Sequence, residues 1–192
     1  MIVLGFDTSA AHVAAALFRD GEIVAETRED MLRGQAERLM VLLEEILDSQ
    51  RITWRDLDAI GVGVGPGNFT GIRVAVSAAR GLALGLGVPA IGINRFEVIE
   101  SGLTRSGIPS VHAPQDKVYV KDAKGEQRLL LAQDANALGE KLNFEPEGFN
   151  PAPTIARLAA KQIHETHARP APLYIKSADA APARDAPPQI IP

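Results

Sequence analysis

Three polar residues at the end of the first apolar segment have types and spacing that could do chemistry. Asp7, Thr8 and Ser9 directly follow residues 2–6, which read as a buried strand. A carboxylate followed by two hydroxyls in a tight turn can hold a hydrated cation and touch a phosphate. The same residue types can instead satisfy the backbone groups of a turn. The sequence leaves both interpretations open.

A glycine-rich loop is the second candidate site. Glycines let backbone amides approach an anion closely, and a helix that follows adds its positive end. No Lys follows the glycines as in a Walker A loop, and no three of them fit G-x-G-x-x-G. The alternative is a structural turn, in which Pro66 fixes one backbone angle and Gly67 adopts a conformation closed to other residues. The candidate residues are Gly65, Pro66, Gly67, Asn68, Phe69, Thr70, Gly71 and Arg73.

Other candidate ligands are isolated along the chain. There is no cysteine, which excludes disulfides, zinc–thiolate sites and thiol nucleophiles. His164 and His167 are three residues apart, but no third ligand is evident, so a solvated helix end is the favoured interpretation. His12 and His112 have no partner visible in the sequence. We therefore predict no catalytic residue, no metal site and no cofactor, and leave nucleotide binding open.

The order of the predicted elements indicates the fold class. Three strands open the chain at residues 2–6, 12–18 and 22–27. Helix, strand, helix, strand and helix then follow at residues 35–49, 57–64, 72–86, 89–93 and 95–102. Three strands, a helix, a strand, a helix and a strand are the order of ribonuclease-H-like and actin-like lobes, so we predict an α/β fold with a mixed sheet.

The chain beyond residue 95 is less regular. The patterns there predict a hairpin at 117–121 and 127–131, a helix at 154–164 and a short strand at 173–175. We predict an N-terminal actin-like lobe, a reduced second lobe and a disordered Ala/Pro-rich tail, at residues 1–95, 96–176 and 177–192.

The two long helices have apolar faces that one sheet alone would not need. On helix 35–49 the apolar arc approaches half the circumference, whereas packing on a sheet needs a stripe of about 100°. On helix 72–86 two glycines lie one turn apart, although a glycine inside a helix costs about 1 kcal/mol relative to alanine. Either these faces are internal core, or they meet another chain. The candidate interface residues are Leu39, Leu42, Leu43, Ile46, Val74, Ala78, Gly81 and Gly85.

Charge and hydropathy limit the classes of partner. The net charge is -4 at pH 7 and no basic run is present, whereas a protein that grips RNA alone normally carries a cationic stripe. Any RNA contact is therefore expected through a partner. The longest uncharged stretch, 81–94, contains Pro89 and is too short to span a bilayer, and the first strand lacks the charged start of a signal peptide. We expect a cytoplasmic protein without membrane contact.

The motifs together resemble one family. The string Asp7-Thr-Ser, followed by Gly65-Pro-Gly-Asn-Phe-Thr-Gly-Ile-Arg73 and Ala79-Arg-Gly-Leu82, is similar to the TsaB (YeaZ) family. The resemblance is strong over residues 1–95 and thins to 117–119 and 172–174 beyond them. Between residues 94 and 170 the chain is shorter than is usual for that family.

This resemblance implies an actin-like ATPase fold and a role in making threonylcarbamoyladenosine in tRNA. In that system the paralogue TsaD transfers the threonylcarbamoyl group with a metal held by histidines of its first helix, TsaB pairs with TsaD helix against helix, and the small ATPase TsaE joins them. Helix 35–49 here has no histidine. The resemblance thus implies a non-catalytic subunit that binds a TsaD-type paralogue through its first two helices. A TsaE-type ATPase would join the complex, tRNA would bind only through it, and a homodimer stays open.

Two other functions compete with that of a non-catalytic subunit. An actin-like kinase or ATPase closes two full lobes over a nucleotide, but the lobe after residue 94 is small and has no glycine-rich adenosine loop. A ribonuclease-H-like nuclease needs several carboxylates at one end of the sheet. Asp7 is well placed for this, but strand 57–64 runs into glycines, and Asp58 lies at its other end.

Overall fold

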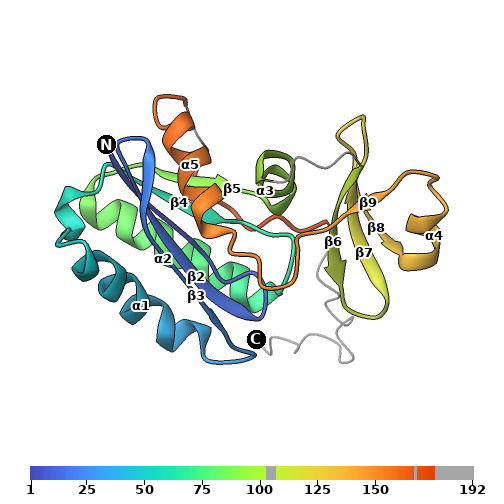
Figure 1. Ribbon diagram of the computed structural model, residues 1–192, viewed down its shortest axis with the longest axis horizontal. Coiled ribbons are helices and arrows are strands. Elements are labelled where there is room, and N and C mark those ends of the chain that lie inside the picture. The colour runs from blue at the N-terminus through green and yellow to red at the C-terminus, as the bar shows by residue number, and fades with distance from the viewer. Residues whose placement is uncertain (103–106, 167, 176–192) are drawn as a thin grey trace, which may run out of the picture.

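The protein consists of a large lobe and a small lobe, each built on one sheet (Figure 1). The computed structural model describes residues 1–102, 107–166 and 168–175. The predicted tail, 177–192, lies outside the described residues.

The large sheet has the strand order β3-β2-β1-β4-β5. β1 (Ile2–Asp7), β2 (His12–Arg19) and β3 (Glu22–Asp30) are antiparallel neighbours, while β4 (Ala59–Gly63) and β5 (Ala90–Ile93) run parallel to β1. This confirms the predicted mixed sheet and the predicted order of strands and helices along the chain. Because β1 and β4 are parallel neighbours, the turns that follow them lie at the same edge of the sheet.

Helices cover both faces of the large sheet. α1 (Gln35–Ser49) and α2 (Phe69–Leu86) pack on one face and α5 (Ala152–Gln162) on the other (Figure 1). α5 can approach the sheet closely because Gly5 and Gly61, which pair in the β1–β4 register, face it. A Cβ on Gly61 would lie 2.8 Å from the Cβ of Ala159.

The apolar arc of α1 is internal core. Its four central residues are at most 5% exposed and pack with β1, β2, β4 and α2 in one cluster; they are Leu39, Leu42, Leu43 and Ile46. The sequence predicted these four as partner contacts, and the structure corrects this. The arc is wide because α1 contacts both the sheet and the flank of α2, so it buries apolar side chains in two directions.

The small lobe is a four-stranded sheet of order β8-β7-β6-β9. It contains β6 (Ile108–Ala113), the predicted hairpin β7 (Lys117–Lys121) and β8 (Gln127–Leu131), and the two-residue β9 (Leu142–Asn143). The five-residue α4 (Ala132–Asn136) packs on β7 and β8. The sequence predicts none of β6, α4 and β9, because α4 and β9 are too short for a periodicity and β6 contains Pro109.

The chain returns to the large lobe after the small one. α5 lies inside the range 96–176 predicted as the second lobe, yet it packs on β1, β2 and β4. The large lobe is therefore made from two stretches of the chain rather than from residues 1–95 alone. Residues 173–175 do not form the predicted strand, although the Leu173 amide donates to the carbonyl of Val64 at 2.8 Å.

α3 and the end of the described chain join the two lobes. α3 (Arg95–Gly102) packs against β6 of the small lobe and against α5 of the large one. Its buried Phe96 and Ile99 cluster with Val111 of β6, and Ile175 packs against the same cluster. These contacts place α3 between the lobes, directly after the edge at which the candidate site lies.

Candidate functional site

The carboxylate of Asp7 is engaged by its own turn and by the next strand. Its Oδ1 accepts hydrogen bonds from the Ser9 amide at 2.8 Å, the Ser9 hydroxyl at 2.9 Å and His12 Nε2 at 2.8 Å. Asp7 is 1% exposed and His12 4%. Sequence reasoning missed this partner of His12. The β1–β2 register pairs Asp7 with Ala14 and puts His12 two residues away on the same face, which is a diagonal cross-strand position.

The other oxygen of Asp7 faces strand β4. Oδ2 is buried without a hydrogen-bond partner among the described residues. A Cβ built on Gly63, the last residue of β4, would lie 1.8 Å from this oxygen. Glycine at position 63 is therefore required by close approach, and the carboxylate is enclosed by the sheet edge rather than open to solvent.

The rest of the acidic turn packs directly on the glycine-rich loop. The Thr8 hydroxyl donates to the carbonyl of Gly71 at 2.6 Å, and the backbone N–H of Asn68 donates to the carbonyl of Ser9 at 2.6 Å. A Cβ on Gly67 would lie 2.2 Å from the backbone carbonyl oxygen of Ser9. A Cβ on Gly71 would lie 1.9 Å from the backbone carbonyl oxygen of Thr8. The two candidate motifs thus form one compact unit.

The start of α2 is closed by its own cap. Asn68 is the N-cap residue, and its side chain accepts a hydrogen bond from the Gly71 amide at 2.9 Å. The expected conformation of Gly67 is corrected by the structure. It is Gly65 that has a positive φ, of 94°, whereas Gly67 is required because it lies against Ser9. Pro66 is buried, while Thr70 and the side chain of Asn68 lie at the surface.

Opposing effects set the protonation of Asp7. Burial acts to raise the pKa of its carboxyl, but the hydrogen bond and charge of His12, the charge of Arg95 and the Ser9 amide lower it by more. The pKa of Asp7 is therefore below its ordinary value, and the group is a carboxylate at neutral pH. Nε2 of His12 consequently carries the proton of their shared hydrogen bond.

Arg95 brings a cation to this edge from the junction of the lobes. It is the first residue of α3, and its amide donates to the carbonyl of Gly65 at 2.8 Å. Its guanidinium forms an ion pair with Glu145 of the small lobe, and both side chains are largely buried. The sequence did not indicate either residue, because the pairing joins segments 50 residues apart.

A cation–aromatic cluster lies at the other side of the α2 start. The Arg73 guanidinium stands 3.7 Å over the ring of Phe69, and its Nε donates to the Tyr174 hydroxyl at 2.8 Å. The rings of Phe69 and Tyr174 are 5.0 Å apart. Phe69 and Arg73 of α2 thus hold the segment around Tyr174, which is far away in the sequence, against this helix.

The remaining histidines form no site in the described chain. His112 stacks on Phe144 with ring centroids 4.1 Å apart, and His164 is exposed after α5. His167, its expected neighbour, lies outside the described residues. Within residues 1–102, 107–166 and 168–175, no group of three or more His, Asp or Glu side chains is placed to hold a metal ion.

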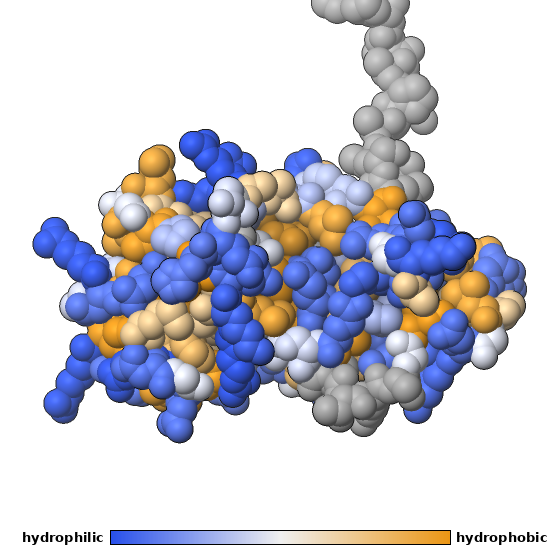
Figure 2. Space-filling view, turned by 90° about the horizontal axis from the view of Figure 1, so that it is seen from above, coloured by the Kyte–Doolittle hydropathy of each residue, from blue (hydrophilic) through white to orange (hydrophobic). Residues whose placement is uncertain are grey.

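The outer face of α2 is open, and it mixes Leu84 and two glycines with polar side chains such as Arg80. The face shown in Figure 2 mixes hydrophilic and hydrophobic residues over both lobes. α2 is long and apolar enough, by length and composition alone, to cross a membrane, yet only 28% of its residues are buried. Leu84 is 86% exposed, and space is open above Gly81 and Gly85. Val74 and Ala78 of the predicted stripe are half-buried beside α1 and the core.

Fold and site together define a ribonuclease-H-like, actin-like protein, with an acidic turn after β1 and a glycine-rich turn after β4. The family described as TsaD, tRNA N6-adenosine threonylcarbamoyltransferase, matches residues 23–180. The tRNA threonylcarbamoyladenosine biosynthesis protein TsaB of Escherichia coli is 31% identical over 124 residues, which cover 62% of this chain and 53% of that protein. TsaB of Bacillus subtilis is 30% identical over 154 residues, which cover 73% of this chain and 67% of that protein.

A solved structure shares the fold of this chain. YeaZ from Pseudomonas aeruginosa superposes with a TM-score of 0.70 at 21% identity, covering 90% of this chain and 99% of that one. The chain belongs to the TsaB (YeaZ) family, within the wider TsaD-like family that matches most of its length. It spans about half the length of the first curated relatives that it matches.

Proposed function

We propose that this chain is a non-catalytic subunit in the biosynthesis of threonylcarbamoyladenosine in tRNA, which binds and supports a TsaD-type transferase. Its similarity to proteins named for this pathway supports the pathway. The observation that carries the non-catalytic role is the state of the acidic turn. The hydroxyls of Thr8 and Ser9 and one oxygen of Asp7 are used in buried hydrogen bonds within the chain.

The chemistry of this turn favours structure over catalysis. In phosphoryl transfer the metal and the phosphates need oxygens that they can reach. Here the second oxygen of Asp7 lies against Gly63, and Arg95 supplies positive charge from within the protein. The acidic turn and the glycine-rich loop then serve to hold β1, β4 and the start of α2 in place.

The docking surface in this proposal is the open face of α2. Leu84 is exposed on this face, and its glycines leave room for a second backbone to approach. A TsaD-type partner would pack a helix along this face, a TsaE-type ATPase would join the complex, and tRNA would bind through the complex.

A reconstitution tests the proposal. This chain and the TsaD-type transferase of the same cell are purified separately, and threonylcarbamoyladenosine formed on tRNA is measured by mass spectrometry with each alone and with both. We expect full synthesis only when both are present, and neither product nor ATP hydrolysis from this chain alone. Turnover by the chain alone that persists through purification and is lost in a folded Asp7→Ala variant would contradict the non-catalytic role.

A further inference from the structure

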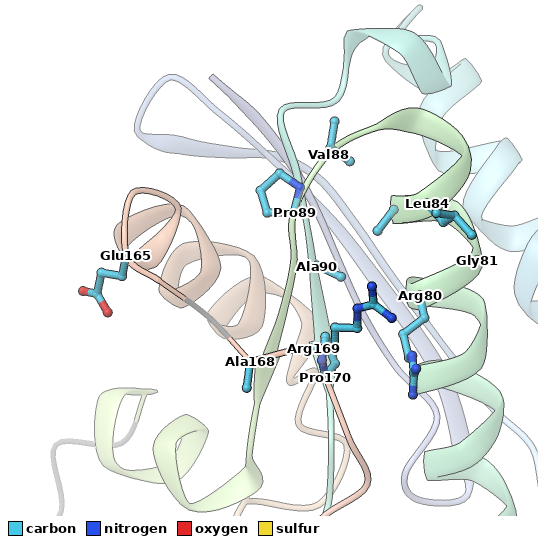
Figure 3. Close-up of a pocket in the computed structure, with 11 residues that line it drawn as sticks. Arg80, Gly81, Leu84, Val88, Pro89, Ala90, Glu165, Ala168, Arg169 and Pro170 are labelled. Carbon is cyan, nitrogen blue, oxygen red and sulfur yellow. The ribbon is translucent and has the colours of Figure 1, made fainter.

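A pocket of about 510 Å³ opens beside the exposed face of α2. Its walls come from the C-terminal half of α2, from the start of β5 and from the segment that leads out of α5 (Figure 3). Leu84, Val88, Pro89 and Ala90 make much of this wall apolar. The volume lies within the range of about 300–1,000 Å³ that is usual for ligand pockets, so it can take more than one side chain.

Two guanidinium groups line this pocket without a carboxylate between them. Arg80 of α2 and Arg169 of the later segment both line the pocket (Figure 3). Neither forms an ion pair with an acidic residue in the described parts of the chain. Glu165 lines the same pocket, but its side chain points away from both arginines. Two like charges beside one apolar wall favour an occupant that brings negative charge.

The pocket is continuous with the docking face of the proposed function. Gly81 belongs both to the pocket wall and to the open glycine face of α2, and the highly exposed Leu84 borders both. A helix packed along α2 would therefore bring its end, or the loop after it, over the pocket. The occupant that fits is a protein segment with an acidic side chain next to apolar ones.

We propose that the pocket receives an Asp or Glu of the TsaD-type partner, held by Arg80 and Arg169 together. This inference rests on the proposed function. Guanidinium groups hold carboxylates through paired N–H···O hydrogen bonds, which are stronger when one side is apolar and water is excluded. The contact would fix the register of the partner along α2, since the glycine face alone is smooth.

Charge-reversal variants test the pocket. The dissociation constant for the TsaD-type transferase is measured by calorimetry for Arg80→Glu, Arg169→Glu, Arg80→Lys and Arg169→Lys. Arg157→Glu is the matched control, because Arg157 is exposed on α5, on the opposite face of the sheet. We expect each Arg→Glu change to weaken binding roughly 30-fold or more, each Arg→Lys change to weaken it less, and the control to bind as the parent does. Melting temperatures of both Glu variants should stay near that of the parent, because both arginines are exposed.

A steric variant separates this inference from the proposed function. Gly85→Trp would block the open face of α2, and Gly85 is not one of the residues that line the pocket. If it abolishes binding while both Arg→Glu variants bind normally, the docking face stands and the acidic contact is refuted. If the unsubstituted chain does not bind the transferase at all, the proposed function fails and the inference with it. If the Arg→Glu changes reduce only the affinity of the complex for tRNA, the pocket binds phosphate and the acidic contact is again refuted.

Discussion

Gly63 and Asp7 are in direct contact at the carboxyl ends of two parallel strands, so that a Cβ on Gly63 would lie 1.8 Å from Asp7 Oδ2. Both residues are buried, and Asp7 cannot withdraw without breaking its hydrogen bonds to Ser9 and His12. The sequence alone suggested that a catalytic carboxylate had been lost at the end of β4. The structure gives the glycine a positive role, which is to accommodate the carboxylate of its neighbour.

We predict that Gly63→Ala lowers the melting temperature by several degrees. Overpacking a tight core site destabilises by about 1–3 kcal/mol, and each kcal/mol corresponds to roughly 2–4 °C in a chain of this size. Thermal melts followed by circular dichroism measure the effect. Gly85→Ala is the control, because a Cβ there meets open space, and replacing a helical glycine should stabilise the protein slightly. Equal melting temperatures for the two variants would contradict the contact.

The acidic turn should make stability dependent on pH. Because the pKa of Asp7 is lowered in the folded protein, its carboxylate contributes stability above the unfolded-state pKa, and this is lost as the pH falls through the folded-state value, below roughly pH 4. Asp7→Asn should be less stable than the parent at pH 7 by about 3–5 kcal/mol, as for a broken buried pair.

The difference between the two proteins isolates Asp7 from the other carboxylates, which both share. It should shrink when urea unfolding is measured at pH 3.5 instead of pH 7. Asp48→Asn, which removes an exposed carboxylate of α1, should show no such difference at either pH. A gap for Asp7→Asn that stays constant down to pH 3 would refute the assigned protonation.

The glycine-rich loop should respond to substitution as a packed turn. Gly67→Val places a branched side chain where the Ser9 carbonyl lies 2.2 Å from the first added carbon, so it should lower the melting temperature strongly. Thr70→Val, at an exposed position in the first turn of α2, should leave it nearly unchanged. A Gly67→Val protein of normal stability that had lost affinity for ATP, measured by calorimetry, would show that the loop is a binding site instead.

How far the sequence predicts the site depends on the distance between the partners along the chain. Asp7, Thr8 and Ser9 were recognised because they are consecutive, and the loop because its glycines are close together. His12 required the strand register, and the pair Arg95 and Glu145 required the arrangement of two lobes. No local pattern could indicate these contacts, because each depends on how distant segments meet.

The fold of the large lobe was more predictable than that of the small lobe for a related reason. β1 to β5 and α1 to α3 have periodic or continuous apolar patterns, and their order defines the topology. The return of α5 to the first sheet was not predictable, since its apolar residues fit either lobe. What selects the large lobe is the small size of Gly5 and Gly61, which lets α5 lie against β1 and β4.

The last prediction separates the core face of α1 from the docking face of α2. Leu43 is fully buried, so Leu43→Asp would place a charge in the core and should prevent stable folding. Gly85→Trp adds a large ring above an open part of α2, so it should fold normally, with an unchanged circular dichroism spectrum and melting temperature, but weaken binding to the TsaD-type transferase by at least tenfold. Gly125→Trp is the matched control, since it also enters open space but at the β7–β8 hairpin of the small lobe. Its positive φ makes it the harsher change for folding, so a control that folds and binds strengthens the comparison. A folded Gly85→Trp protein that binds as tightly as the parent would show that the open face of α2 is not the docking surface.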